Sequence, residues 1–180
     1  MKHILICGKR NAGKTELLDR LLAACRMPLY GFRSCITATR EDGFHEIHMF
    51  PICDAERRPT DENRIGICNR SEREINLRVF ETLGVRLLEA KPDGILVMDE
   101  LGFMEAEAEA FCKAVLHCLD GDIPVLATVR AGDLGSSFLD RVRTHPEAEL
   151  YSVAPENIDD LYHRLLPVIE GWNEVLKCGS

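Results

Sequence analysis

The segment HILICGKRNAGKTELLDRLLAAC, residues 3–25, decides the expected fold of this chain. Residues 3–7 are a short, mostly apolar run that predicts a fully buried strand. Residues 8–15 form a glycine-rich turn, and the leucines that follow recur at helical spacing. A buried strand, a glycine-rich turn and a helix in direct succession indicate the first unit of a sheet that packs against helices.

The turn GKRNAGKT, residues 8–15, matches the pattern G-x-x-x-x-G-K-[ST] in full. Gly8 and Gly13 allow backbone turns that a Cβ atom would block, so that loop amides can point at phosphate oxygens. Lys14 would contact the β- and γ-phosphates, and the Thr15 hydroxyl would bind Mg²⁺. The predicted nucleotide-binding residues are Gly8, Lys9, Arg10, Asn11, Ala12, Gly13, Lys14 and Thr15.

Two adjacent acids, Asp99 and Glu100, follow the apolar run at residues 95–98. An apolar strand that ends in Asp has the Walker B form, and we expect Asp99 to hold Mg²⁺, usually through a water. Because adjacent side chains on a strand point to opposite faces, Glu100 would face the space beyond the γ-phosphate and polarise a water there. The alternative role for Glu100 is a helix or loop cap. Kinases that use a bound alcohol need no water-activating acid, so the pair favours hydrolysis.

Apolar strands alternate with helices along the rest of the chain, which predicts one α/β domain over residues 1–180. We expect a mainly parallel sheet flanked by helices on both faces. An antiparallel hairpin over 29–50, with its turn at Asp42-Gly43, would lie at one edge. Residues 52–73 are expected to be a mobile loop; a short strand over 65–68 is an alternative within it. Further strands are predicted at 94–98, 122–129 and 148–154, and helices at 72–90, 105–119, 137–143 and from 157 onward.

The strand at 122–129 should lie between the strands that carry the glycine-rich turn and the two acids. Its end would place Thr128 and Arg130 near the γ-phosphate. Thr128 would sense the phosphate or hold the attacking water, and Arg130 would stabilise developing charge in the manner of an arginine finger. Other arginines compete for that role: Arg33, Arg40, Arg57, Arg58, Arg64 and Arg70.

The composition restricts the possible partners and the compartment. A net charge of −8 and a pI of about 5.3 argue against a nucleic-acid binder that works by bulk electrostatics. The 8 cysteines form no CxxC pair, which indicates free thiols in a reducing cytosol. No apolar stretch approaches the ~20 residues needed to span a bilayer, and the N-terminal apolar run is too short for a signal peptide. We therefore expect a cytoplasmic protein without a membrane partner.

Other acidic and histidine residues have simpler explanations than a metal site. His45 and His48 are three apart on a predicted strand, so their side chains face opposite sides. Glu105, Glu107 and Glu109 alternate at the expected start of a helix, where we interpret them as solvated acids that suit the helix dipole.

Five motifs occur in a fixed order: GKRNAGKT, YGF at 30–32, VMDELGFME at 97–105, PVLATV at 124–129 and PEN at 155–157. Together they resemble small stand-alone P-loop nucleoside-triphosphatases, sometimes called cancer-related nucleoside-triphosphatases, over nearly the whole chain. The resemblance implies a RecA-like P-loop NTPase core and Mg²⁺-dependent hydrolysis of several nucleoside triphosphates, such as ATP and GTP. It implies that Asp99 is the magnesium acid and Glu100 the water-activating acid.

The chain departs from that family at three places. Arg33, Ser34 and Cys35 stand where the family usually has a threonine and an acid, Arg130 where it often has a histidine, and Ala106 where it tends to have a leucine. Lys14, Glu100 and Arg130 are the predicted catalytic residues, and Thr15 and Asp99 the predicted metal ligands. The alternatives are a P-loop kinase of a nucleoside or other small molecule, and a nucleotide-dependent binding switch.

Overall fold

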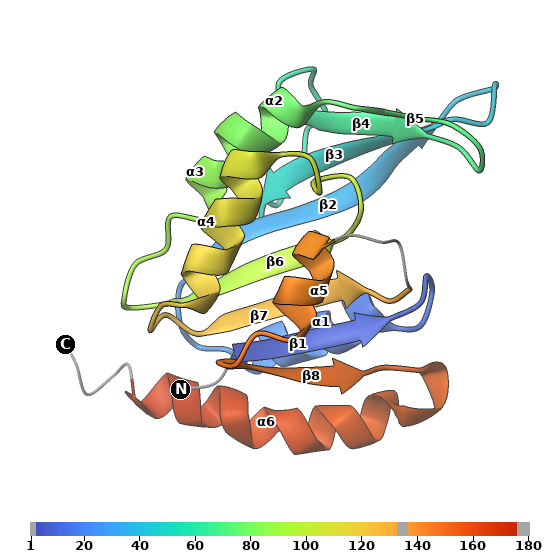
Figure 1. Cartoon of the computed structure of the whole chain (residues 1–180). Coiled ribbons are helices and arrows are strands. Elements are labelled where there is room, and N and C mark those ends of the chain that lie inside the picture. The colour runs from blue at the N-terminus through green and yellow to red at the C-terminus, as the bar shows by residue number, and fades with distance from the viewer. Residues whose placement is uncertain (1–2, 133–136, 176–180) are drawn as a thin grey trace.

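The computed structural model describes residues 3–132 and 137–175 of the 180-residue chain. Within these residues one sheet contains eight strands in the order β5-β4-β3-β2-β6-β7-β1-β8 (Figure 1). The strands are β1 His3–Gly8, β2 Leu29–Thr39, β3 His45–Pro51, β4 Arg64–Cys68, β5 Arg73–Ile75, β6 Ile95–Leu101, β7 Val125–Arg130 and β8 Ala148–Ser152.

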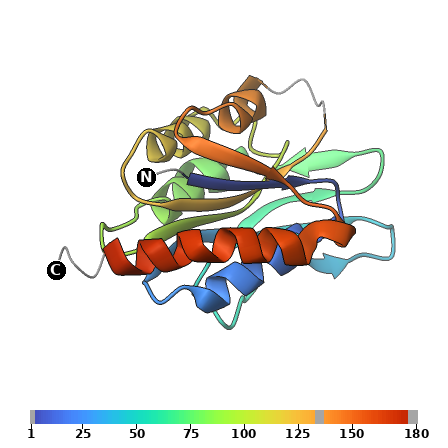
Figure 2. The same ribbon diagram turned by 90° about the horizontal axis from the view of Figure 1, so that it is seen from below.

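Helices cover both faces of this sheet, as predicted. α1 and α6 lie on one face, and α4 and α5 lie on the other, as the view from below shows (Figure 2). The helices are α1 Lys14–Ala24, α2 Leu77–Val79, α3 Val85–Leu87, α4 Glu109–Leu119, α5 Ser137–Arg143 and α6 Ile158–Val175. A π-helical turn, η1 Phe80–Gly84, joins α2 to α3, and a 3-10 turn, η2 Pro155–Asn157, precedes α6.

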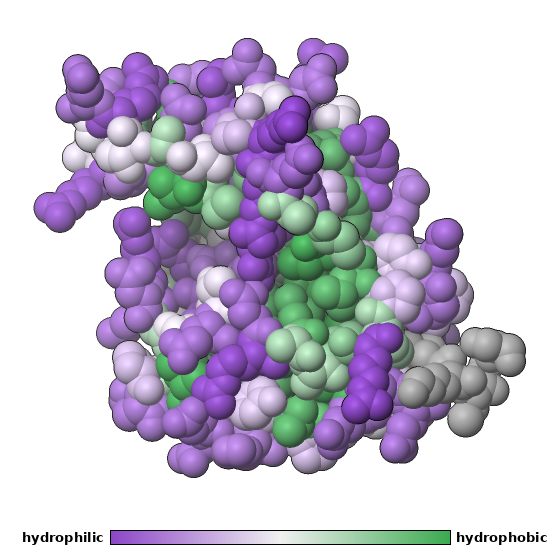
Figure 3. All heavy atoms as spheres, turned by 180° about the vertical axis from the view of Figure 1, so that it is seen from behind, coloured by the Kyte–Doolittle hydropathy of each residue, from purple (hydrophilic) through white to green (hydrophobic). Residues whose placement is uncertain are grey.

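Two hydrophobic cores fill the space between the sheet and its helices. One lies under α4 and α5 and contains Phe32, Phe111 and Leu139. The other lies under α1 and α6 and contains Leu17, Leu21 and Trp172. Seen from behind, hydrophobic side chains gather along the middle of the molecule within a hydrophilic rim (Figure 3). No helix among residues 3–132 and 137–175 is long and apolar enough to cross a membrane.

The strands β2, β6, β7, β1 and β8 run parallel, and β7 lies between β6 and β1. This order confirms the predicted position of residues 122–129. The carboxyl ends of the parallel strands therefore meet at one edge, on the right of Figure 1 and on the left of Figure 3, where the surface is hollowed. Ligands of open α/β sheets bind at that edge.

The predicted hairpin is confirmed, and the sheet extends beyond it. β2 and β3 are antiparallel, and their turn is closed by the Arg40 N–H, which donates to the Phe44 carbonyl at 2.8 Å. β4 and β5 then add two antiparallel strands at the far edge. The short strand offered at residues 65–68 is confirmed as β4, which begins one residue earlier, whereas the expectation of a loop is wrong at Arg73, where β5 begins. β4 pairs with the backbone groups of β3 that a loop would leave open, and β5 does the same for β4.

Several element boundaries differ from the predicted ones. The helix expected from residue 72 begins at Leu77, because Arg73–Ile75 pair with β4. β6 continues to Leu101, so both adjacent acids lie within the strand rather than after it. α4 begins at Glu109, and residues 102–108 form a folded segment between β6 and α4. The seven cysteines among the described residues are all free thiols; Cys178 lies outside those residues.

Candidate active site

The glycine-rich turn connects β1 to α1 and requires both of its glycines. Gly13 has a φ of +92°, and a Cβ atom there would lie 2.4 Å from Cδ1 of Ile158. A Cβ atom on Gly8 would lie 2.8 Å from Cγ1 and 3.0 Å from the carbonyl oxygen of Val153. Both contacts are shorter than packed atoms tolerate, so the loop depends on residues without a side chain.

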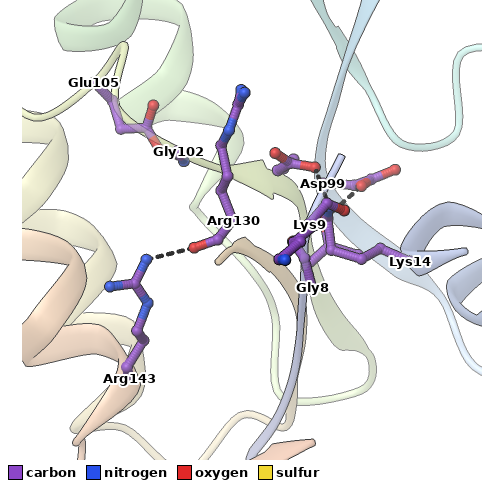
Figure 4. A network of polar contacts seen from close by, with 10 residues as sticks. Gly8, Lys9, Lys14, Asp99, Gly102, Glu105, Arg130 and Arg143 are labelled. Atoms are coloured by element: carbon purple, nitrogen blue, oxygen red, sulfur yellow. Dashed lines mark hydrogen bonds and ion pairs between the residues drawn. The ribbon is translucent and has the colours of Figure 1, made fainter. Parts of the chain in front are cut away.

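Lys14 lies at the centre of this turn, with only 5% of its surface exposed. Its Nζ donates to the carbonyl oxygens of Gly8 and Lys9, at 3.0 and 2.9 Å. The same Nζ lies 3.2 Å from Oε2 of Glu100 on β6. Figure 4 shows the lysine folded back against Gly8 and Lys9. The structure thus brings together two of the predicted catalytic residues, one from the start of α1 and one from β6.

A cavity of about 350 Å³ opens beside this lysine, and we call it the phosphate cavity. Its lining comes from the glycine-rich turn, the start of α1 and the end of β6: Arg10, Asn11, Gly13, Lys14, Thr15, Glu16 and Glu100. Gly8 and Lys9 do not line this cavity, but their carbonyl groups accept the hydrogen bonds that hold the side chain of Lys14 beside it. The side chain of Ala12 is buried in the core under α1 and α6, so this residue could contact a phosphate only through its backbone amide.

Asp99 is buried, with 3% of its surface exposed, and both of its carboxylate oxygens have protein partners. Oδ1 accepts a hydrogen bond from Oγ1 of Thr128 at 2.6 Å, and Oδ2 accepts one from Nε of Arg33 at 2.8 Å. Burial raises the pKa of Asp99, and the hydrogen bond from Thr128 and the charge of Arg33 oppose that rise.

Arg33 is the residue whose role sequence reasoning missed, since we considered it only as one of several possible arginine fingers. It is 8% exposed, and β2 and β6 pair it directly with Asp99. Its Nη2 also donates to Oδ1 of Asp19 on α1 at 2.5 Å. The signal in the sequence was the charged residue inside an otherwise apolar strand next to the acid strand. A buried charge requires a charged partner nearby.

Asp99 and Glu100 contact separate partners, although they are adjacent and joined by a cis peptide bond. Asp99 contacts Thr128 and Arg33, whereas Glu100 contacts Lys14. Within the described residues Glu100 contacts the Lys14 amine and caps no helix or loop, so the arrangement favours its role beside the phosphates.

Arg130 does not point at the glycine-rich turn in this structure. Its guanidinium carbon lies 4.9 Å from the ring centroid of Phe103, and its carbonyl oxygen accepts a hydrogen bond from Nη2 of Arg143 (Figure 4). Thr128 is fully buried and bonded to Asp99. Both residues lie at the carboxyl end of β7, as predicted, but an arginine finger at position 130 would require the side chain to leave the aromatic ring.

Glu105 was expected to be solvated, and that expectation is wrong. The side chain is 3% exposed, and Oε1 accepts a hydrogen bond from the backbone N–H of Gly102 (Figure 4). Burial raises its pKa to about 7; hydrogen bonds from backbone N–H groups oppose the rise, and the charge of Glu100 adds to it. The error arose because α4 begins four residues later than predicted, so that Glu105 closes a turn instead of starting a helix.

Comparisons with known proteins bear on the family and the fold of this chain. A family model described as NTPase matches residues 3–166. The chain is 26% identical over 171 residues to the nucleoside-triphosphatase THEP1 of Thermotoga petrophila, covering 93% of this chain and 92% of that protein. It is 30% identical over 134 residues to the protein of the same name from Pyrobaculum islandicum, covering 72% and 75% of the two chains.

Two solved structures share the fold. The crystal structure of THEP1 from Aquifex aeolicus aligns with a TM-score of 0.72 at 23% identity, over 93% of this chain and 99% of that chain. The solution structure of a human cancer-related nucleoside triphosphatase aligns with a TM-score of 0.66 at 20% identity, over 95% and 98% of the two chains. These alignments confirm the predicted P-loop NTPase fold.

Proposed function

The chain belongs to the NTPase family, and from that premise we propose that it hydrolyses nucleoside 5'-triphosphates to diphosphate and phosphate. Family membership confirms the predicted resemblance and the predicted enzyme class, nucleoside-triphosphatase. The observation that supports the detailed proposal is the contact of 3.2 Å between Lys14 in the glycine-rich turn and Glu100 on β6. Both side chains line one cavity, which supports their assignment as the phosphate-binding cation and the general base.

In this proposal the phosphate cavity receives the triphosphate. The amides of residues 11–15 and the start of α1 attract the phosphate oxygens, because the N-terminus of a helix carries partial positive charge. Lys14 now neutralises Glu100 and donates to two carbonyl groups. Arrival of a triphosphate offers this lysine a more highly charged partner, so the Lys14–Glu100 contact would break. Glu100 is then free to accept a proton.

Glu100 would accept the proton of a water that attacks the γ-phosphorus. A carboxylate held at the end of a strand can orient this water and remove its proton as the bond to phosphorus forms. The γ-phosphorus would separate from the bridging oxygen, and the diphosphate would leave. Lys14 and the loop amides would stabilise the charge that develops on the phosphate oxygens.

Mg²⁺ is part of the proposal, and the residues at this site fit it. Asp99 uses one acceptor site on each oxygen, while a carboxylate has about four, so it can still accept hydrogen bonds from metal-bound water. Thr15 supplies an exposed hydroxyl at the start of α1. No group of three or more His, Cys, Asp or Glu residues in the described part of the chain could hold a metal ion alone. The ion would therefore bind together with the phosphates, whose charge it neutralises.

Phosphate release by the purified protein tests this function. The protein should release phosphate from ATP, GTP, CTP and UTP in the presence of MgCl₂. The variant Lys14→Ala should lose this activity, because it lacks the cation that contacts the β- and γ-phosphates. Equal phosphate release by the native protein and by Lys14→Ala, for all four nucleotides, would refute the proposal.

A further inference from the structure

A second cavity, of about 220 Å³, lies beside the phosphate cavity, and we call it the sheet-edge cavity. Its walls come from β2, β3 and β4 on one side and from the segment after β6 on the other. Hydrolysis needs only a water molecule at the γ-phosphate, and a cavity of this size exceeds that need, since a water occupies about 30 Å³ of liquid volume.

The lining of the sheet-edge cavity is largely apolar. Ile47, Ile65 and Phe80 supply side chains from three different elements. Ile36 also lines it and is 46% exposed, one of three large hydrophobic side chains exposed among the described residues; the others are Leu150 and Val168. An exposed apolar side chain inside a concave site favours contact with a ligand that has an apolar surface.

The two cavities share part of their lining. Glu100 and Arg10 line both the phosphate cavity and the sheet-edge cavity. A molecule in the sheet-edge cavity would therefore lie next to the same carboxylate that we assign to water activation. The other charged residues of the cavity are Arg130 and Glu105. Glu105 is buried, Arg130 packs on the ring of Phe103 and Glu100 is paired with Lys14, so apolar side chains dominate the surface open to a ligand and favour one without a charge.

We propose that the sheet-edge cavity binds a small, neutral alcohol with an apolar ring or chain, and that its hydroxyl group faces Glu100 as a phosphoryl acceptor. This inference rests on the proposed binding of a triphosphate at the glycine-rich turn. Water would take the place of the hydroxyl when the cavity holds no alcohol, so hydrolysis is the reaction without an acceptor.

Transfer of the γ-phosphoryl group to the alcohol needs no group beyond those already named. The alcohol oxygen attacks the γ-phosphorus, and Glu100 accepts the hydroxyl proton. The bond from the γ-phosphorus to the bridging oxygen breaks, and the nucleoside diphosphate leaves with the electron pair. The products are a phosphate monoester and the diphosphate, with no oxidant or reductant involved.

Binding can be tested without nucleotide, with benzyl alcohol as the probe and ¹³C-labelled isoleucine δ1 methyl groups as reporters. The methyl resonances of Ile36, Ile47 and Ile65 should shift on titration, whereas that of the core residue Ile169 should not. Ile36→Trp should fill the mouth and weaken binding by about 10-fold or more, equivalent to about 1.4 kcal/mol. Leu150→Trp is the matched control, since Leu150 is similarly exposed on β8.

An absence of shifts at the three cavity isoleucines, up to the solubility limit of benzyl alcohol, would overturn the binding site. Unchanged affinity in Ile36→Trp would also overturn it. Because neither measurement contains a triphosphate, both outcomes can be told apart from failure of the proposed hydrolase function.

Phosphoryl transfer is tested with MgATP and benzyl alcohol together. ADP should form in excess of free phosphate, and benzyl phosphate should account for the difference. Benzyl methyl ether, which has a similar ring but no hydroxyl, should leave ADP and phosphate equal. Equal amounts of ADP and phosphate at saturating benzyl alcohol would contradict the acceptor role.

Discussion

Nε of Arg33 lies 2.8 Å from Oδ2 of Asp99, so the predicted magnesium acid is already paired with a buried cation of the protein. Arg33 bridges two acids, since its Nη2 also contacts Asp19 on α1. This network ties β2 and α1 to the end of β6 at the point where the proposed chemistry occurs. It also compensates the charge of Asp99, which burial would otherwise make costly.

Arg33→Met should therefore destabilise the protein strongly. Removal of one partner from a buried ion pair typically costs about 3–5 kcal/mol, because the other charge stays buried and unpaired. Urea unfolding measures the change. Lys113→Met removes an exposed ion pair with Glu109 on α4 and should cost less than about 1 kcal/mol. Equal losses in the two variants would show that Arg33 does not compensate a buried charge.

Mg²⁺ should show no saturable binding to the nucleotide-free protein. The oxygens of Asp99 already have partners, and no larger cluster of ligands exists among the described residues. Isothermal titration with MgCl₂ should show saturable binding only after a nucleotide is added. EDTA should abolish phosphate release, and excess MgCl₂ should restore it. Tight, saturable binding of Mg²⁺ to the free protein would contradict this account of the metal site.

Gly13→Ala should damage the glycine-rich turn by two effects, an unfavourable φ and a clash with Ile158. Gly43→Ala is the matched control, because Gly43 has a φ of +82° but open space around it. In the control the free energy of unfolding should fall by only about 1 kcal/mol, the cost of the left-handed conformation for a residue with a Cβ atom. In Gly13→Ala it should fall further, and the affinity for nucleotide should fall as well. Thermal unfolding and nucleotide titration distinguish the two variants; similar behaviour would show that the clash is relieved by movement.

Glu105 should make the protein less stable as pH rises from about 4.5 to about 7. The pKa of Glu105 is raised in the folded state to about 7 from 4.5, so the folded protein binds the extra proton in this range. Its contribution is fully present below pH 4.5 and is lost as pH rises through 7, by up to about 3 kcal/mol. Glu105→Gln should remove this dependence, while exposed Glu107→Gln should retain it. Unfolding curves at several pH values test this, and identical pH profiles for the native protein and Glu105→Gln would contradict it.

Local sequence patterns predicted much of the fold. The strand, turn and helix around the glycine-rich segment and the hairpin at Asp42-Gly43 depend on short-range preferences, so they were predictable from neighbouring residues. β5 was missed because it has only three residues, two of them charged, and because its stability comes from pairing with β4. Such pairing depends on tertiary context, which local propensity does not contain.

The candidate site was predictable in its residue types but less so in its contacts. The motifs placed Lys14 and Glu100 near the phosphates, and the structure brings them to 3.2 Å. The pairing of Arg33 with Asp99 depends on the register between β2 and β6, which are separated by more than fifty residues in sequence. The burial of Glu105 depends on how the segment before α4 folds. The burial of Glu105 leaves no local pattern, and the apolar residues around Arg33 indicate a buried charge without identifying its partner.

The central claim is that Glu100 removes the proton of the attacking water. Glu100→Gln keeps the shape of the side chain and removes the basic oxygen, so the rate of phosphate release should fall by roughly 10²–10⁴. Nucleotide affinity should stay close to that of the native protein, unlike that of Lys14→Ala. A single-turnover assay with MgATP, together with a nucleotide titration of both variants, measures the two quantities separately. A rate for Glu100→Gln within about twofold of the native rate would contradict the claim, since a lost general base costs far more than that.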